Sequence, residues 1–346
     1  MGDDGCVVDP VERYLAYLTA LERSPNTVRA YATSLSLWFE FLAQVGVGWA
    51  DAGVEDVARF VSWLRAPATN VIVLETGTGR RSAATVNRHL AGLFGFYDHH
   101  ARSGVSLAGD LVAWRRVGRG SYQPFLHHVT KGKPIATRPV KLVVARRAPR
   151  TLDAEQVVAV LAACEHLRDR FLLALLAETG MRIGQALGLR HADFVSRDRE
   201  VRIVARPDNA NGARAKVRTT AVIPVSTPLV RLYSEYMHAE YGELDSDYVF
   251  VNLWGGRVGH PLCYATVHKL IARIGARTGV EFTAHMLRHT HATDLIRRGV
   301  PIEVVARLLT HRSSTTTSQT YIHLDVTDVR VALTRAGVWD ETRSGR

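Results

Sequence analysis

The sequence predicts a mainly α-helical protein with a small β-sheet, arranged as two domains joined by a basic linker. Three observations lead to this fold class. Apolar side chains recur with a helical period over the first hundred residues, the period changes to that of a strand near residue 200, and a long stretch without acidic residues separates the two regions. A chain of 346 residues also exceeds what one ordinary core holds, which favours two domains.

Four helices account for the first domain, which we expect to span residues 8–103. Each has apolar or aromatic side chains on one face, and no strand pattern competes with them. The second helix has the clearest bounds, because Ser24 can cap it, Pro25 suits the first helical position, and Gly46 can end it. The expected helices cover residues 11–21, 25–46, 54–64 and 82–99. The aromatic stripe on these helices is interpreted as core rather than as a binding surface.

A basic linker is expected over residues 104–150. Between Leu111 and Leu152 there is no Asp or Glu, and ten Lys or Arg residues there account for nearly all of the net charge of +11. This composition is typical of a strap that follows a polyanion, although a solvated linker has it too. Four prolines interrupt the segment, which disfavours the long amphipathic helix that binds membrane surfaces.

The composition disfavours several other classes of protein. The three cysteines, Cys6, Cys164 and Cys263, lie far apart with no CxxC, so neither a disulfide framework nor a cysteine zinc site is expected. The N-terminus lacks the basic and apolar regions of a signal peptide. The longest apolar runs, such as residues 171–177, are too short to span a membrane. We therefore expect a cytoplasmic protein with no membrane partner.

The second domain is expected over residues 151–338. Asp153 and Gln156 suit a capping box, and Gly180 should end the apolar helix that follows at 167–179. The period then changes to two in residues 201–205 and 221–225, which predicts a β-hairpin or a small sheet with a mobile connection. The remaining expectations are a short helix from Met181, helices at 229–241, 262–278 and 326–337, and a strand-like piece at 248–252.

Chemistry-bearing side chains are concentrated between residues 285 and 323. The first part should be a helix, with a stripe at helical spacing formed by Met286, His289, Thr290 and Thr293. His285 and Arg288 are three residues apart, so a helix projects both from one face. A cation beside an imidazole makes a seat for an anionic oxygen. Gly299 and Pro301 punctuate the helix end and the start of the next helix.

Several strings in the second domain match known motifs. TGMRIGQALGLRHADF is similar to the first arginine motif of the tyrosine recombinases, or phage integrases, and HMLRHTHAT, LLTHRSS and SQTYIHL are similar to that family's His-x-x-Arg, second-histidine and nucleophile motifs. The match covers roughly residues 11–337. The strings PFLHHVTKGKP, MRIGQALGLRHADF, DNANGARAK and VFVNLWGG look closest to transposase subunits of transposons. The resemblance implies a helical, SAM-like core-binding domain followed by a mixed α/β catalytic domain.

The resemblance also implies six catalytic residues, namely Arg182, Lys216, His285, Arg288, His311 and Tyr321. Tyr321 would attack a DNA phosphate and form a 3′-phosphotyrosyl ester, so that rejoining needs no ATP. The arginines would clamp the non-bridging oxygens, while the histidines add hydrogen bonds and one helps to deprotonate the tyrosine. Lys216 would protonate the departing 5′ oxygen, or Arg214 or Arg218 would do so if the register differs. No metal or other cofactor is required.

One position departs from the family pattern. Leu309-Thr310-His311 stands where Leu-Gly-His is usual. The conformation of the local turn therefore stays open, whereas the assignment of His311 does not. His289 and His291 lie on the same helix as His285 and are interpreted as packing or supporting groups.

Double-stranded DNA is the expected partner. The candidates for DNA contact are Arg88, Arg115, Arg116, Arg146 and Arg147. The resemblance implies a C-shaped clamp that assembles as a homo- or hetero-tetramer on two DNA sites, with companion recombinase subunits as one option. The function indicated is a site-specific DNA recombinase, with integration, excision, transposition and chromosome resolution all open. The alternatives are an inactive or accessory DNA-binding subunit and an enzyme like a type IB topoisomerase; the six filled positions and the separate helical domain disfavour them.

Overall fold

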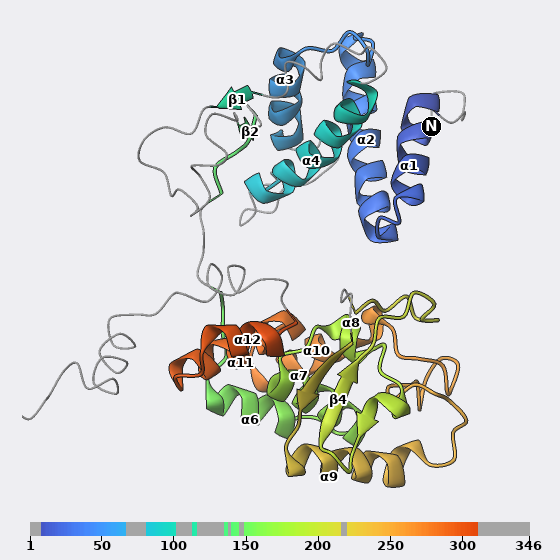
Figure 1. Ribbon diagram of the computed structural model, residues 1–346, viewed down its shortest axis with the longest axis vertical. Coiled ribbons are helices and arrows are strands. Elements are labelled where there is room, and N and C mark those ends of the chain that lie inside the picture. The colour runs from blue at the N-terminus through green and yellow to red at the C-terminus, as the bar shows by residue number, and fades with distance from the viewer. Residues whose placement is uncertain are drawn as a thin grey trace, which may run out of the picture. The chain divides into compact units, whose positions relative to one another are not determined.

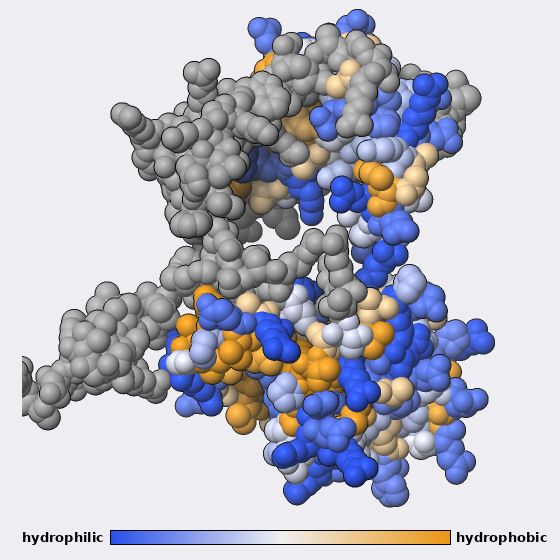
Figure 2. Space-filling view, in the orientation of Figure 1, coloured by the Kyte–Doolittle hydropathy of each residue, from blue (hydrophilic) through white to orange (hydrophobic). Residues whose placement is uncertain are grey.

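A computed structural model describes residues 8–66, 81–101, 113–115, 135–137, 140–144, 149–215 and 220–310 (Figure 1). The chain divides into two compact units, Met1–Arg146 and Arg147–Arg346. Each unit is described by itself, and the domain bounds expected from the sequence, 8–103, 104–150 and 151–338, stay predictions. Among the described residues no helix is long and apolar enough to cross a membrane. Figure 2 shows many hydrophilic residues on the surface of each unit, as the charged content of 22% predicts.

The described helices of the first unit confirm the four that the sequence predicts. They are α1 (Asp9–Ala20), α2 (Pro25–Val45), α3 (Val54–Arg65) and α4 (Ala83–His100). The predicted bounds of α2 hold, because the Ser24 hydroxyl accepts a hydrogen bond from the Thr27 amide and Gly46 has a left-handed φ of 67°. α2 packs against both α1 and α4 (Figure 1).

The aromatic stripe of these helices forms the core of the first unit. Trp38 and Tyr97 are fully buried, and their polar atoms are paired: Trp38 Nε1 donates to the Tyr97 hydroxyl at 3.0 Å, which donates to the Trp49 carbonyl at 2.7 Å. Their pairing matters because an unmatched polar group in a core is costly. The interpretation of this stripe as core is confirmed.

Two polar residues of α4 are not ordinary solvated surface, because they are hydrogen-bonded to other parts of the unit. His89 is buried, with Nδ1 3.1 Å from the Ser34 hydroxyl. Asn87 exchanges two hydrogen bonds with the backbone of Leu142, at 2.8 and 2.9 Å. The end of the basic linker is therefore attached to α4. The helical period of the sequence does not predict this contact.

Within the linker, the backbone forms a two-stranded antiparallel ribbon that the sequence did not predict. β1 (Ala113–Arg115) pairs with β2 (Ile135–Thr137), with Trp114 opposite Ala136. Three-residue strands are too short for period two to stand out from a polar, proline-rich background.

The second unit combines helices with a three-stranded antiparallel sheet of order β3-β4-β5. Its first half contains α6 (Ala154–Ala162), α7 (Leu167–Thr179), α8 (Ile183–Ala186), the 3₁₀ turn η2 (His191–Asp193), β3 (Phe194–Val195), β4 (Glu200–Ile203) and β5 (Ala221–Pro224). Its second half contains α9 (Thr227–Tyr236), the π-helical turn η3 (Met237–Tyr241), α10 (Tyr264–Thr278), α11 (Ala284–Arg297) and α12 (Ile302–Leu308). The predicted capping box of α6 is present, since Asp153 and Gln156 each accept a hydrogen bond from the other's backbone amide.

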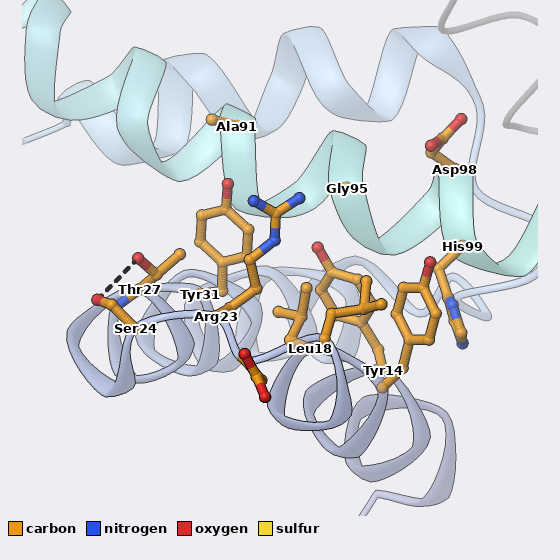
Figure 3. Close-up of a pocket in the computed structure, with 13 residues that line it drawn as sticks. Tyr14, Leu18, Arg23, Ser24, Thr27, Tyr31, Ala91, Gly95, Asp98 and His99 are labelled. Atoms are coloured by element: carbon orange, nitrogen blue, oxygen red, sulfur yellow. Dashed lines mark hydrogen bonds between the residues drawn. The ribbon is translucent and has the colours of Figure 1, made fainter. Parts of the chain in front are cut away.

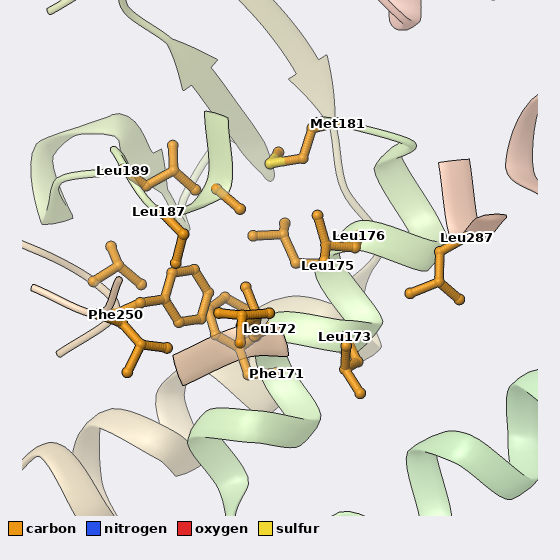
Figure 4. Close-up of a cluster of buried hydrophobic side chains, with 14 of the residues drawn as sticks. Phe171, Leu172, Leu173, Leu175, Leu176, Met181, Leu187, Leu189, Phe250 and Leu287 are labelled. Atoms are coloured by element: carbon orange, nitrogen blue, oxygen red, sulfur yellow. The ribbon is translucent and has the colours of Figure 1, made fainter. Parts of the chain in front are cut away.

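Helix α7 is the centre of this unit. Phe171, Leu172 and Leu175 are fully buried, and the helix packs against α6, α9 and α11 (Figure 4). Gly180 ends it with a φ of +60°. A Cβ at this glycine would lie 2.7 Å from Cδ2 of His291 and 2.9 Å from a methyl carbon of Leu309. Only glycine fits here, because the backbone is left-handed and the end of α7 meets both α11 and the end of α12.

The described part of the connection between β4 and β5 is held by side-chain hydrogen bonds. This part, residues 204–215, is anchored by two asparagines. Asn211 Nδ2 donates to the carbonyls of Leu187 and Leu262, and Asn209 Nδ2 donates to the Ala213 carbonyl at 2.8 Å. The backbone turns within this segment, where the Gly212 amide donates to the Asn209 carbonyl at 2.8 Å. The strand-like piece at 248–252 makes only the isolated bridges Arg190–Tyr248 and Val251–Pro261 among the described residues.

The predicted helix at His285 is confirmed as α11, but its most buried side is not the predicted stripe. Leu287, Arg288 and Ala292 are its buried residues, whereas Met286, His289, Thr290 and Thr293 are only partly buried. The reason is that a charged side chain, Arg288, occupies the inward face. The period of the apolar residues predicts that charged side chains face solvent, so it does not predict that Arg288 is buried.

Candidate active site

The Arg288 side chain is held between two helix ends. It is 1% exposed, and its two terminal nitrogens donate hydrogen bonds of 2.7 Å to the carbonyls of Gly180 and Leu309. Gly180 follows α7 and Leu309 follows α12. Carbonyls at helix C-termini have partial negative charge, so a guanidinium is stabilised there. These two bonds fix the position of a cation that would otherwise be costly to bury.

Arg182 reaches the same helix end from another direction. It precedes α8, and its Nη1 donates to the Thr310 hydroxyl at 3.0 Å. Gln185 supports it twice: the Arg182 amide donates to Gln185 Oε1 at 2.6 Å, and Gln185 Nε2 donates to the same Thr310 hydroxyl at 2.9 Å. The consecutive residues Leu309 and Thr310 thus each accept a hydrogen bond from one of the two arginines.

His285 lies in the electrostatic field of both arginines. His285 is exposed, but partial burial of its ring lowers its pKa, and the charges of Arg288 and Arg182 lower it further. A lowered pKa keeps the imidazole neutral at neutral pH, so that one ring nitrogen can donate and the other can accept a hydrogen bond. The structure therefore brings Arg182, His285 and Arg288 together, an arrangement with the chemistry to bind an anion beside a neutral imidazole.

Two further histidines of α11 are partly buried next to this group. The His289 ring packs edge-on against His285, with ring centroids 4.3 Å apart. Burial, followed by the neighbouring His285 and Arg288, lowers the pKa of His289 to about 4. Burial also lowers the pKa of His291 to about 4, against the opposing effects of Asp294 and the Ala177 backbone. Both side chains are suited to neutral packing roles.

The other predicted site residues lie wholly or partly outside the described residues. Lys216, His311, Tyr321, Arg116, Arg146 and Arg147 are not described, and Arg115 is described by its backbone alone, in β1. Arg88 lies exposed on α4, and Arg214, the nearest described alternative to Lys216, is partly buried.

The chain just before Lys216 packs against α8. A Cβ at Gly184 would collide with the Tyr264 hydroxyl and would lie 2.7 Å from the Arg214 carbonyl oxygen. Ala213 and Ala215 are buried in the same core. The segment that leads to Lys216 therefore begins beside the short helix that follows Arg182.

Sequence reasoning missed Thr310 and Gln185 as parts of the site. For Thr310 the only signal was its departure from the glycine usual in the family. For Gln185 the signal was its place three residues after Arg182, where a side chain can cap the start of a helix.

The first unit contains a separate cavity of about 560 Å³ between α1, α2 and α4 (Figure 3). Its lining includes Tyr14, Arg23, Tyr31, Asp98 and His99. Of the predicted catalytic residues that the structure describes, Arg182, His285 and Arg288, none lines it.

Family models match both parts of the chain. The phage integrase family matches residues 150–327, and the N-terminal SAM-like domain of phage integrases matches residues 11–104.

Full-length relatives are similar over most of the chain. Transposase A from transposon Tn554 of Staphylococcus aureus is 41% identical over 326 residues, which cover 94% of this chain and 90% of the relative. The tyrosine recombinase XerD of Mycobacterium leprae is 30% identical over 89% of this chain and 90% of its own length. The expected similarity to transposases of this kind is thereby confirmed.

Solved structures share the fold at lower identity. The Tn1549 transposon integrase in complex with transposon right end DNA has a TM-score of 0.65 and 14% identity, covering 95% of this chain and 99% of that structure. A lambda integrase dimer bound to a core site has a TM-score of 0.60 and 16% identity, covering 92% and 97%. The predicted fold class, helical with a small sheet, is confirmed.

Proposed function

This chain belongs to the phage integrase family, and from that premise we propose that it is a transposase that moves a mobile element by tyrosine-dependent strand exchange. As a member of the family it is a site-specific recombinase, an enzyme that transfers DNA strands. The choice of transposition among the reactions of such enzymes rests on the 41% identity to a transposase. We expect it to act in the cytoplasm, which suits its scattered cysteines.

The observation that carries the mechanism is the convergence of Arg182 and Arg288 at the end of α12, beside His285. Two guanidiniums at one place suit the two non-bridging oxygens of a phosphodiester, whose negative charge increases in the pentacoordinate transition state. A neutral imidazole there can donate a hydrogen bond to the same phosphate or accept a proton.

In the proposed first step, the Tyr321 hydroxyl oxygen bonds to phosphorus and the bond from phosphorus to the 5′ oxygen breaks. The tyrosine proton passes to His285 or His311, and Lys216 gives a proton to the departing 5′ oxygen. The product is a 3′-phosphotyrosyl ester and a free 5′ hydroxyl. Attack on that ester by the 5′ hydroxyl of another strand reverses the chemistry and restores Tyr321, without a metal ion or ATP.

The position of the chain before Lys216 supports its proposed role. Residues 213–215 pack beside α8, and Arg182 is the residue that precedes α8. A side chain that starts from this segment begins close to the proposed phosphate clamp.

The direct test uses a DNA duplex from the ends of the cognate element, nicked next to the cleavage site so that the short leaving strand diffuses away. Wild-type protein should form a covalent adduct with the DNA, and Tyr321→Phe should form none. The enzymatic proposal fails if the wild type gives no adduct on any cognate end, or if the phenylalanine variant gives the same one.

The element ends, tested as a duplex and within supercoiled plasmids, separate the two alternative functions. An accessory DNA-binding subunit would bind the ends without an adduct, even with its companion subunits present. An enzyme of the topoisomerase kind would relax supercoiled plasmids whether or not they contain the element ends. A transposase should instead require those ends and join strands between two DNA molecules.

A further inference from the structure

Thr310 has a backbone conformation that a threonine rarely adopts. It follows α12 with a φ of +53°, and its amide donates to the Arg307 carbonyl at 2.9 Å. Glycine is the usual residue at such a helix end, because a side chain branched at Cβ is strained in the left-handed region. Among the described non-glycine residues with positive φ, namely Glu22, Arg199 and Thr310, only Thr310 is branched at Cβ. Strain of this kind persists where the surrounding structure compensates for it.

The compensation lies in the Thr310 hydroxyl. A hydroxyl oxygen has two lone pairs, and here both accept: one from Arg182 Nη1 at 3.0 Å and one from Gln185 Nε2 at 2.9 Å. Glycine at this position would relieve the strain but would leave both donors without this acceptor.

Gln185 makes this arrangement rigid. It is 2% exposed, and its Oε1 accepts from the Arg182 amide at 2.6 Å while its Nε2 donates to Thr310. The backbone of Arg182, the Gln185 amide group, the Thr310 hydroxyl and the Arg182 guanidinium therefore form a closed ring of hydrogen bonds. In such a ring the long arginine side chain has less rotational freedom than it has in water.

Leu309, the residue before Thr310, binds the second arginine, Arg288. The Leu309 carbonyl accepts from Arg288 at 2.7 Å. The Leu309 contact uses a backbone atom and tolerates any side chain, whereas the Thr310 contact requires a hydroxyl. The end of α12 thus sets the relative positions of both guanidiniums.

We propose that Thr310 is a positioning residue for strand transfer, whose hydroxyl holds the Arg182 guanidinium in the orientation that clamps the phosphate. This inference rests on the proposed function, in which Arg182 binds the scissile phosphate. A charge that stabilises a transition state acts strongly only when it is oriented beforehand. Loss of the hydroxyl should therefore slow the chemistry without weakening DNA binding.

The central experiment compares three variants by single-turnover cleavage of the nicked DNA duplex at saturating protein. Thr310→Val keeps the shape and the strain but removes the hydroxyl, and we expect its adduct to form more slowly by on the order of 100-fold. Thr310→Ser keeps the hydroxyl and should restore most of the rate. Thr310→Gly should melt at a temperature equal to or above that of the wild type, yet cleave as slowly as the valine variant. All three should bind the DNA duplex as tightly as the wild type.

A double-variant comparison tests whether the effect passes through Arg182. If the hydroxyl acts by orienting the guanidinium, Thr310→Val should slow an Arg182→Lys enzyme far less than it slows the wild type. Undiminished cleavage by Thr310→Val overturns the proposal, and so does a serine variant as slow as the valine one or an equal slowing in both backgrounds.

A measurement independent of activity separates this inference from the proposed function. Nuclear magnetic resonance of the free protein, with the Arg182 signals assigned by their loss in Arg182→Lys, reports rotation of the guanidinium. Rotation should be slow in the wild type and fast in Thr310→Val. Equal rotation in both overturns the positioning role even if the wild type cleaves DNA. Absence of any adduct from the wild type would count against the proposed function alone.

Discussion

At the scale of residues, the two arginines of the site are held in different ways. Arg288 is buried and donates to two backbone carbonyls, whereas Arg182 is partly exposed and donates to a side-chain hydroxyl. Arg288 therefore joins α7, α11 and α12 in addition to its proposed role in chemistry. The two arginines should differ in their importance for stability.

We predict that Arg288→Ala lowers the free energy of unfolding by about 3 kcal/mol, because it removes two charge-assisted hydrogen bonds and leaves a buried gap. Arg182→Ala should cost less than about 1 kcal/mol, although both variants should lose DNA cleavage. Urea unfolding followed by circular dichroism measures the difference. Equal destabilisation by the two substitutions would contradict this assignment.

The partly buried histidines of α11, His289 and His291, predict how stability depends on pH. The folded-state pKa of His289 and of His291 is about 4, below the value of 6.5 expected in the unfolded chain. The unfolded chain therefore binds protons first as the pH falls. The stability contributed by the neutral histidines is fully present above about pH 6.5 and is lost between there and about pH 4.

The urea midpoint should accordingly fall between pH 7 and pH 5, and His291→Leu should make the fall shallower. His291 is a suitable residue to replace with leucine, because its Nε2 is buried and has no hydrogen-bond partner among the described residues. A midpoint that stays constant over this range, or an identical slope in the variant, would refute the assignment.

At the scale of elements, the end of α7 is the junction on which the site depends. Gly180 and Gly279 form a matched pair, because both follow a helix with a left-handed φ, of +60° and +68°. At Gly279 a Cβ would meet nothing within 4 Å, whereas at Gly180 it would meet His291 and Leu309.

Gly279→Ala should therefore cost only the backbone strain, about 1 kcal/mol. Gly180→Ala should cost more and should also slow cleavage, because His291 or Leu309 must move and the Gly180 carbonyl holds Arg288. Thermal melting and the rate of adduct formation measure the two effects. Equal behaviour of the two variants would show that the close contacts at Gly180 relax without consequence.

The helices and their ends were predictable because their signals are local. Ser24, Asp153 and Gly180 end or begin helices where the sequence places them, since capping depends on residues within one turn. The inward side of α11 was not predictable. Its Arg288 is buried by carbonyls from α7 and α12, which are distant in sequence and invisible to a helical period.

For the described part of the candidate site, the sequence predicted which residues come together but not their geometry. Family motifs indicated Arg182, His285 and Arg288, and the structure brings them together. At Thr310 the sequence showed only that the expected glycine is replaced. It did not predict the hydrogen bond to Arg182, because a contact across 128 positions of sequence leaves no local pattern. A tertiary contact of this kind is read only from coordinates.

At the scale of the whole molecule, the basic linker predicts how DNA affinity responds to salt. Each phosphate neutralised by a cation contributes about 0.9 to the slope of log affinity against log salt concentration. Changing Arg115, Arg116, Arg146 and Arg147 to glutamine should therefore lower the slope by up to about 3.6. Filter binding at several salt concentrations measures it.

A control variant changes four arginines that are paired with carboxylates, Arg13, Arg59, Arg277 and Arg298. It removes the same total charge, so a general effect of charge on affinity would appear in both variants. An unchanged slope in the linker variant would mean that the linker does not contact phosphate.

Assembly is the last property that the whole chain predicts. The sequence favours a helix at residues 326–337 after Tyr321, and Val326, Val329, Val331 and Leu333 give it a short apolar surface. In the tetramer that the family resemblance implies, we expect this helix to dock on a neighbouring protomer. A protein truncated before Asp325 retains all six proposed catalytic residues, so it should bind a single site and form the tyrosine adduct.

The truncated protein should nevertheless fail to exchange strands between two sites, because exchange needs protomers on both DNA molecules in one complex. Native gel shifts count the protomers bound to one and to two sites, and a plasmid recombination assay measures exchange. A leucine-to-serine change at Leu333 in the full chain tests the apolar contact without removing residues. Full recombination by the truncated protein would show that assembly uses another surface.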